Sequence, residues 1–211
     1  MTDVGTLISG FRTFKATEYE RFKDLIAHVV QLQIKPKTMF ICCSDLRIPP
    51  GKIFSSNPGE LFIIRNLGAL VPPYRLGEVS DAIAAIEYAV GTLEVDNIIV
   101  MGHAYCDAMK LFFYNNEEDR NVSEAVNHWY SMAKTAKDAV LKQLPDKTPE
   151  EQELAFEQEI ILISLKNLLA YPSVSKRVKN KTIQLYGWLF NIREGMLAAF
   201  DPKTRTFEPV E

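Results

Sequence analysis

Residue types that can hold a metal or act as nucleophiles are concentrated directly after two apolar segments of the chain. The segment TMFICC (38–43) is followed by Ser-Asp-Leu-Arg, and the segment NIIVMG (97–102) is followed by His-Ala-Tyr-Cys. Thiol and imidazole groups are preferred ligands of zinc, and a thiolate is also a strong nucleophile. Two kinds of chemistry are therefore open: a zinc site built from both segments, or a thiol enzyme that uses one of the cysteines.

The geometry of strands and turns favours zinc. Successive side chains of a strand point to opposite faces, so only one of Cys42 and Cys43 can join a given site. A turn after the second segment can bring His103 and Cys106, which are three positions apart, onto one ion. With one of the two cysteines they form a Cys2His set, and three protein ligands leave the fourth position of a catalytic zinc open. A single strand cysteine is usually only a small buried residue, but this coincidence of ligands at two strand ends favours a metal.

Other thiol and phosphate chemistries fit the sequence less well. A phosphatase-type loop needs a longer spacing between its cysteine and its arginine than the four residues between Cys42 and Arg47 or the three between Cys43 and Arg47. Neither a G-x-G-x-x-G nor a P-loop pattern is present to bind a nucleotide.

The elements that must position these residues follow from the apolar pattern. Three short segments are continuously apolar, as expected of strands covered by helices on both faces, and a fourth apolar segment lies near the C-terminus. The predicted strands are TMFICC (38–43), LFIIRN (61–66), NIIVMG (97–102) and TIQLYGWL (182–189). Helical patterns lie between them, so the sequence predicts an α/β fold with a mainly parallel β-sheet core flanked by helices. Ligands of such sheets bind beyond the carboxyl ends of the strands, which is where both chemical segments lie.

Two helices have clear sequence signals. The apolar residues of SDAIAAIEYAVGTL, Tyr88 included, are spaced for a buried helix. Farther along the chain, Thr148 is a suitable N-cap, Pro149 suits the first helical position, and Glu151 completes a capping box. The helix that starts there is expected to end before Pro172.

Length and composition fit one globular domain. The chain has 211 residues, of which 47% are hydrophobic and 24% are charged, values typical of a folded protein. We expect a single domain over residues 1–211, with a helical arm at 1–35 and the α/β core at 36–211.

Charge and cysteine usage restrict the partners and the compartment. Lys and Arg number 24 against 27 Asp and Glu, and no basic stripe is present, so we expect no nucleic-acid partner. No apolar run approaches the about 20 residues that a membrane helix needs, and the first residues do not resemble a signal peptide. Three cysteines, two of them adjacent, argue against a disulfide framework. These features predict a cytoplasmic protein.

The motifs C-x-D-x-R (Cys43, Asp45, Arg47) and H-x-x-C (His103, Cys106) resemble those of the β-class carbonic anhydrases. Further segments resemble this family in the same order, and the resemblance as a whole covers residues 7–207. The segments are CSDLRIPPGKIF, PGELFIIRNLGALVPPY, IEYAVGTLEVDNIIVMGH and IQLYGWLFNIREGMLAAFDPKTRTF.

The resemblance implies one zinc ion per chain, held by Cys43, His103 and Cys106, and the reversible hydration of carbon dioxide to bicarbonate and a proton by zinc-bound hydroxide. It also implies that Asp45 accepts a hydrogen bond from the zinc water and that Arg47 holds Asp45 away from the metal. Zinc can make hydroxide available at neutral pH, an effect for which carbonic anhydrase is itself the standard example. A guanidinium is a suitable clamp for a carboxylate.

The resemblance further implies a small apolar substrate pocket that is completed across a homodimer. The matching positions are Phe62, Leu67 and Tyr88, with Gln33 as an amide donor to bicarbonate, although its spacing to the cysteine is one residue longer than usual. Asp107 follows the second cysteine, where its backbone N–H can serve the substrate. We expect an obligate homodimer or a homotetramer, because the N-terminal stretch (7–30) is also richer in apolar residues than a lone surface helix requires.

Three positions depart from the family pattern. Asp107 stands where glycine is common, Ala69 where an asparagine is usual, and Ala104 where a serine is usual. The carboxylate of Asp107 is the most consequential, because a like charge beside the site disfavours bicarbonate. These departures motivate one alternative, a zinc-containing relative that binds bicarbonate or a partner with little or no turnover. The other alternative is a thiol enzyme that uses Cys42 or Cys43.

Overall fold

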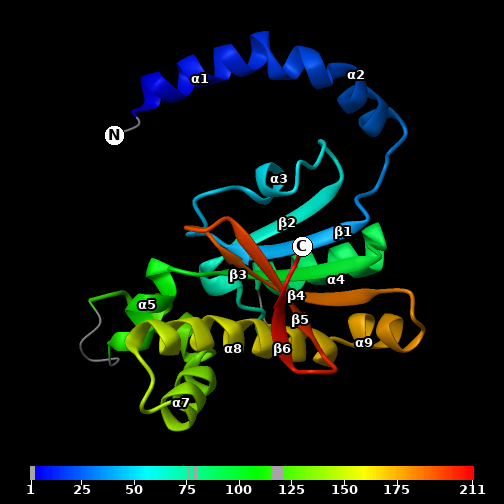
Figure 1. Ribbon diagram of the computed structural model, residues 1–211. Coiled ribbons are helices and arrows are strands. Elements are labelled where there is room, and N and C mark those ends of the chain that lie inside the picture. Colours follow the sequence, from blue (N-terminus) through cyan, green and yellow to red (C-terminus); the bar gives the residue numbers. More distant parts are fainter. Residues whose placement is uncertain (1–2, 76, 78–79, 116–120) are drawn as a thin grey trace.

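The computed structural model describes residues 3–75, 77, 80–115 and 121–211, and this part of the chain forms one six-stranded sheet with helices around it (Figure 1). The strands are β1 (Thr38–Cys43), β2 (Leu61–Asn66), β3 (Asn97–His103), β4 (Gln184–Asn191), β5 (Met196–Asp201) and β6 (Thr206–Pro209). The helices are α1 (Val4–Ala16), α2 (Glu18–Gln31), α3 (Pro50–Ile53), α4 (Asp81–Tyr88), α5 (Asp107–Tyr114), α6 (Glu124–Ser131), α7 (Lys134–Gln143), α8 (Pro149–Ala170) and α9 (Pro172–Lys179). A 3-10 turn covers Leu67–Ala69, and a π-helical turn covers Ala89–Leu93.

The sheet order is β2-β1-β3-β4-β5-β6, and the first four strands are parallel to one another. Strands β5 and β6 are added in antiparallel orientation. The predicted α/β fold with a mainly parallel sheet is therefore confirmed. Because β1 and β3 are neighbours, with Cys42 opposite Met101, their carboxyl ends meet at one edge of the sheet and bring the two chemical segments together.

Alternate residues of β1 enter two different hydrophobic clusters, as expected of a strand covered on both faces. Met39 and Ile41 pack in one cluster, whereas Phe40 and Cys42 pack in the other with the aromatic residues of α5. All four are at most 1% exposed. The core on both faces therefore fixes the end of β1, and with it the position of Cys43.

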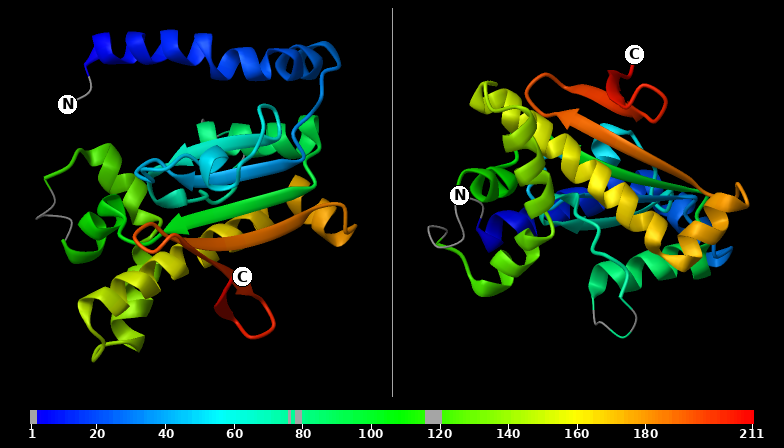
Figure 2. Two further views of the ribbon diagram at one scale, coloured as in Figure 1. Left: turned by 45° about the horizontal axis from the view of Figure 1, so that its top comes forward. Right: turned by 90° about the horizontal axis from the view of Figure 1, so that it is seen from below.

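Helix α8 begins and ends where the sequence predicts. The side chain of Thr148 accepts a hydrogen bond from the backbone N–H of Glu151, whose carboxylate accepts one from the N–H of Thr148. Figure 2 shows α8 crossing β3 and β4 on one face of the sheet. The helix packs closely because Gly187 of β4 has no side chain: a Cβ there would lie 2.8 Å from Cγ2 of Ile161.

Three details of the sequence prediction were wrong. Strand β2 is not covered on both faces: it is the edge strand of the sheet, and Ile63 is 41% exposed. Tyr88 is 50% exposed, although Ile86 and Val90 beside it are buried, because two positions along a helix rotate a side chain by about 200°. Strand β4 starts at Gln184 rather than at 182, because Thr182 is hydrogen-bonded through its backbone to Arg177 of α9.

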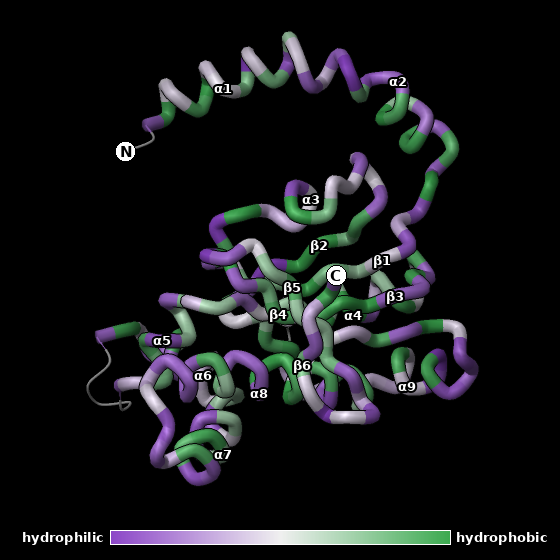
Figure 3. Tube along the Cα trace, viewed as in Figure 1, coloured by the Kyte–Doolittle hydropathy of each residue, from purple (hydrophilic) through white to green (hydrophobic). Residues whose placement is uncertain are grey.

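Helices α1 and α2 form an N-terminal arm in which no residue is buried. Figure 1 shows the arm extending past the β2 edge of the sheet, and Figure 3 shows apolar residues distributed along it. Leu7 and Phe11 are each 61% exposed, so the arm has an apolar surface that its own chain leaves uncovered. Among the described helices, none combines the length and the apolar character needed to cross a membrane.

Candidate metal and active site

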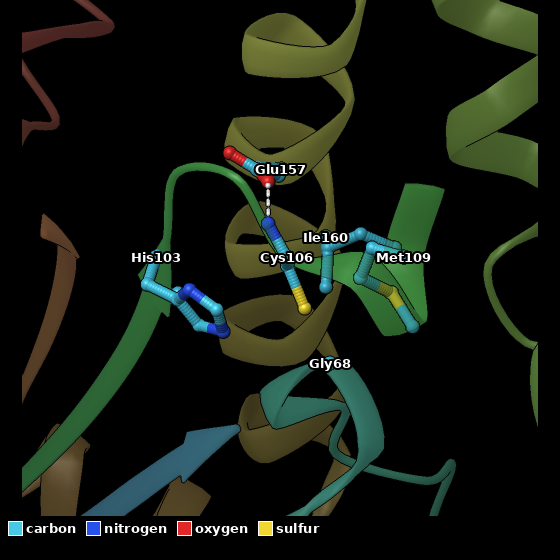
Figure 4. Close-up of a pocket in the computed structure, with 7 residues that line it drawn as sticks. Gly68, His103, Cys106, Met109, Glu157 and Ile160 are labelled. Atoms are coloured by element: carbon cyan, nitrogen blue, oxygen red, sulfur yellow. Dashed lines mark hydrogen bonds between the residues drawn. The ribbon is translucent and has the colours of Figure 1, made fainter. Parts of the chain in front are cut away.

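The side chains of Cys43, His103 and Cys106 converge where the carboxyl ends of β1 and β3 meet. Their donor atoms all lie within 4.8 Å of one another, and the two sulfur atoms are 3.5 Å apart. All three residues are at most 3% exposed. In Figure 4 the side chains of His103 and Cys106 extend from the two ends of the same turn into the same part of the site.

Hydrogen bonds select Cys43 as the more acidic of the two thiols. The hydrogen bond with the Cys106 thiol lowers the pKa of Cys43, and contacts with His103 and with the backbone N–H groups of Asp45 and Gly68 act in the same direction, against burial. The pKa of Cys106 is raised, first by the hydrogen bond to Cys43 and then by burial. The two sulfur atoms are close enough to share one proton, and a cation that replaces this proton fits the pair.

The turn that carries His103 and Cys106 is held from beneath by α8. The N–H of Cys106 donates a hydrogen bond of 3.1 Å to Oε1 of Glu157, as Figure 4 shows. Glu157 is 6% exposed, and burial, the largest cause, raises the pKa of its carboxyl to about 8. At the start of the turn, the N–H of Ala104 donates to the carbonyl of Phe190 in β4. A strand and a helix therefore fix the two ends of the turn.

Arg47 lies between two carboxylates beside this centre. Its Nη2 is 3.1 Å from Oδ1 of Asp45 and 2.9 Å from Oδ2 of Asp107. The N–H of Asp107 donates to Oδ2 of Asp45, so Asp45 is held by the guanidinium and by the backbone of the ligand turn. The carboxylate of Asp107 forms an ion pair with Arg47. This pairing reduces the repulsion of bicarbonate that the position of Asp107 in the sequence predicts.

The segment after β2 forms the opposite wall. Gly68 has a φ of +75° and donates its N–H to Sγ of Cys43 at 3.3 Å. A Cβ at this position would lie 2.5 Å from Sδ of Met109, so both the conformation and the close packing require glycine. Leu67 is adjacent, and its carbonyl accepts a hydrogen bond from Nε1 of Trp129 in α6. Of the predicted pocket residues, Leu67 is thus beside the centre.

The other predicted pocket residues lie away from the centre of their own chain. Phe62 pairs with Met39, four positions before Cys43 in the register, which corresponds to about 13 Å along the strands. The ring of Tyr88 is 6.0 Å from the ring of Phe62. Gln33 is exposed between α2 and β1, at the amino end of β1 rather than at its carboxyl end.

The donor set of the centre fits zinc. Nε2 of His103 is buried and has no hydrogen-bond partner among the described residues, so a lone pair there is available to a cation. Two sulfurs and one imidazole are soft and borderline ligands, and such ligands bind zinc in preference to magnesium or calcium. The Cys-His-Cys trio is also the only group of three potential metal ligands found within the described part of the chain.

Comparison with models of protein families matches residues 38–197 to the family described as carbonic anhydrase. The chain belongs to the carbonic anhydrase family. It is 35% identical to a carbonic anhydrase of Synechocystis sp. over 195 residues, which are 92% of this chain and 70% of that protein. It is 32% identical to a carbonic anhydrase of Helicobacter pylori over 96% of this chain and 92% of that one.

The solved structure of the β-carbonic anhydrase CcaA matches this fold with a TM-score of 0.92 at 32% identity, and the match covers 99% of this chain and 100% of that chain. The protein is thus an enzyme, a carbonic anhydrase of the β class. Cys42 is a poor nucleophile for the thiol-enzyme alternative, because it is fully buried and burial, the largest cause, raises the pKa of its thiol to about 11. For Cys43, family membership and the convergence with His103 and Cys106 favour a metal centre over a thiol enzyme.

Several residues of the site were not identified from the sequence. Glu157 is one of several acids in α8, with Glu153 and Glu159 close by, so the sequence does not distinguish it. Trp129 contacts Leu67 across 62 positions of sequence, which no local pattern indicates. Arg65 binds the carbonyls of Cys43 and Leu46 and so fixes the chain after β1.

Proposed function

We propose that this β-carbonic anhydrase interconverts carbon dioxide and bicarbonate at one zinc ion per chain, held by Cys43, His103 and Cys106. The observation that carries the proposal is the convergence of these three donor atoms within 4.8 Å, with Nε2 of His103 buried and unpaired among the described residues. When bound, zinc supplies Lewis acidity, which makes a hydroxide nucleophile available near neutral pH.

Asp45 and Arg47 act as a positioning pair in this proposal. The carboxylate of Asp45 is 24% exposed beside the three ligands, and it can accept a hydrogen bond or the proton that hydration releases. Arg47 holds Oδ1 of Asp45, while the N–H of Asp107 holds Oδ2. Two donors on opposite oxygens restrict the carboxylate to one orientation, which is the requirement for a group that must accept a proton without ligating the metal.

The substrate pocket is proposed to be shared between two chains. Leu67 lies beside the centre of its own chain, whereas Gln33, Phe62 and Tyr88 lie too far from it. A second copy of the chain can supply these three residues to the site, with apolar walls for carbon dioxide and an amide for bicarbonate. The uncovered apolar surface of the arm supports a homodimer or a homotetramer, because a surface of this kind is normally buried in an assembly.

The alternative is a zinc-containing relative with little turnover, which Asp107, Ala69 and Ala104 motivate. The pairing of Asp107 with Arg47 favours a working enzyme, because the added carboxylate is compensated. Ala69 and Ala104 keep structural roles through their backbones, which bind Ser164 and Phe190 respectively.

Metal analysis and a carbon dioxide hydration assay test the proposal together. We expect about one zinc per chain in the purified protein, loss of zinc and of hydration in Cys43→Ala and Cys106→Ala, and neither loss in Cys42→Ala, which changes the adjacent thiol. Stoichiometric zinc in Cys43→Ala would exclude this ligand set. Full zinc with no measurable hydration in the unmodified protein would favour the low-turnover alternative.

A further inference from the structure

The turn after β3, which joins the proposed ligands His103 and Cys106, contains an unfavourable backbone conformation. Tyr105 has a φ of +61°, in the left-handed region. Asn, Asp and Gly adopt this region readily, whereas a bulky aromatic residue rarely does. Cys106 is the next residue, so any relaxation of Tyr105 toward an ordinary conformation moves a sulfur donor of the metal centre.

The side chain of Tyr105 is held by an arginine from another part of the chain. The guanidinium carbon of Arg193 lies 3.7 Å from the centre of the Tyr105 ring, which is direct stacking contact. Arg193 makes no ion pair among the described residues, so this ring is the partner that its guanidinium has. Cation–aromatic stacking of this kind fixes both groups.

Arg193 is presented by a rigid support. It belongs to the tight turn between β4 and β5, in which Oδ1 of Asn191 accepts hydrogen bonds from the N–H groups of Arg193 and Glu194. Nδ2 of Asn191 also donates to the carboxylate of Glu194, and the turn closes at Gly195, whose φ is +67°. The β4–β5 turn is therefore ordered by its own contacts, and it can act as a fixed point for the ligand turn.

We propose that Arg193 is a positioning residue of the metal centre: it stacks on Tyr105 and keeps the His103–Cys106 turn in the conformation that presents both ligands. The inference rests on the proposed zinc site. Three contacts hold the His103–Cys106 turn: the carbonyl of Phe190 binds its start, Glu157 binds the N–H of Cys106, and Arg193 stacks on the Tyr105 ring between them. The first two hold backbone N–H groups, and the third holds the one residue whose conformation is strained.

The sign of the effect separates positioning from simple electrostatics. Removing a positive charge near a cation site strengthens cation binding if charge alone matters. If Arg193 positions the turn, its removal weakens binding instead. In addition, the effect must depend on residue 105, because an asparagine there adopts the left-handed conformation without support.

A double-mutant cycle with zinc affinity as the readout tests the proposal. Zinc affinity is measured by competition with a chromophoric chelator for the unmodified protein, Arg193→Ala, Tyr105→Asn and the double variant. We expect Arg193→Ala to bind zinc about three- to fivefold more weakly, the range that an exposed cation–aromatic contact allows. In the Tyr105→Asn background the same change is expected to alter affinity by less than about twofold. Lys203→Ala, in the neighbouring β5–β6 turn, removes an exposed positive charge as the matched control.

A second readout needs no metal. In chelator-treated protein, the rate at which iodoacetamide modifies Cys106, followed by peptide mass spectrometry, is expected to rise in Arg193→Ala and to be unaffected by the same change in the Tyr105→Asn background. Unchanged or tighter zinc binding in Arg193→Ala, or an equal loss in both backgrounds, would overturn the positioning role. If the unmodified protein binds no zinc, the proposed function fails, and the Cys106 modification rates still decide whether Arg193 holds the turn.

Discussion

Arg47 shows how the neighbours of a residue, rather than its type alone, define its role. From the sequence it is one half of an Asp-Arg pair, but in the structure its Nη2 lies within 3.1 Å of two carboxylates, Asp45 and Asp107. The guanidinium is 65% exposed in the single chain, so each ion pair by itself contributes little to stability. The main effect of these contacts is to orient Asp45, which also accepts a hydrogen bond from the N–H of Asp107.

Removal of the guanidinium tests this orientation. In Arg47→Ala we expect zinc to be retained and carbon dioxide hydration to fall by at least about a hundredfold, the upper end of the effect of losing an oriented outer partner of a metal site. The physical reason is that Asp45 loses the contact to Oδ1 and can turn toward the three ligands. Metal analysis and stopped-flow hydration on the same sample provide the measurement.

Asp107→Asn is the control for that experiment, because it removes the second carboxylate of the network and keeps the backbone N–H that binds Asp45. Its activity is expected to stay within about tenfold of the unmodified protein. Near-normal hydration in Arg47→Ala would show that the guanidinium does not orient Asp45.

At the scale of elements, α8 connects the two walls of the site. In its first half, Glu157 accepts a hydrogen bond from the N–H of Cys106. Two turns further on, Ser164 is fully buried; its Oγ accepts the N–H of Val71 and donates to the carbonyl of Ala69, both at 3.1 Å. The segment after β2, which contains the Gly68 N–H donor to Cys43, is thus fixed to the same helix as the ligand turn.

Ser164→Ala is expected to reduce the free energy of unfolding by about 1–3 kcal/mol, since it leaves a buried N–H and a buried carbonyl without their partner. Urea denaturation followed by circular dichroism measures the change. Ser131→Ala, which removes an exposed hydroxyl bonded to its own helix, is expected to change the value by less than about 0.5 kcal/mol. If the two variants lose equal stability, Ser164 is not the link between α8 and the β2 segment.

At the scale of the whole molecule, one chain does not bring all of the proposed site residues together. The proposed ligands lie at the carboxyl ends of the strands, whereas Gln33 and Tyr88 lie elsewhere in the same chain and are exposed. In a symmetric dimer each chain can supply these residues to its partner's centre. The arm adds exposed apolar residues, such as Phe11, to the surface available for this contact.

Subunit complementation tests the shared site. Cys106→Ala removes a proposed ligand, and the double variant Gln33→Ala and Tyr88→Ala removes two proposed pocket residues. Each protein alone is expected to hydrate carbon dioxide poorly. After the two are mixed, unfolded and refolded together, a hybrid dimer contains one intact site, so about a quarter of the normal activity should return. Sedimentation is expected to show a dimer or tetramer for every sample. An active monomer at micromolar concentration, or no recovery in hybrids that do form, would contradict a shared pocket.

The amino-acid sequence by itself determined the fold class and the chemical segments. Continuous apolar runs at β1 and β3 predicted buried parallel strands, because strands covered on both faces lack polar alternation. The run at β2 predicted a parallel strand correctly but not its burial, because β2 is the edge strand of the sheet. The capping box at Thr148 predicted the start of α8, because its hydrogen bonds join residues three positions apart. The family motifs that contain Cys43, His103 and Cys106 are likewise local in sequence, so they indicate the candidate ligands without the tertiary structure.

Only the tertiary structure decided the contacts that depend on packing between distant segments. The pairing of Asp107 with Arg47, the support of Cys106 by Glu157 and the stacking of Arg193 on Tyr105 each join residues far apart in the chain. The exposure of Tyr88 likewise depends on which face of α4 meets the sheet. A local pattern constrains backbone conformation and burial along one element, whereas which side chains meet is fixed by the order and register of the strands and by where α8 crosses them.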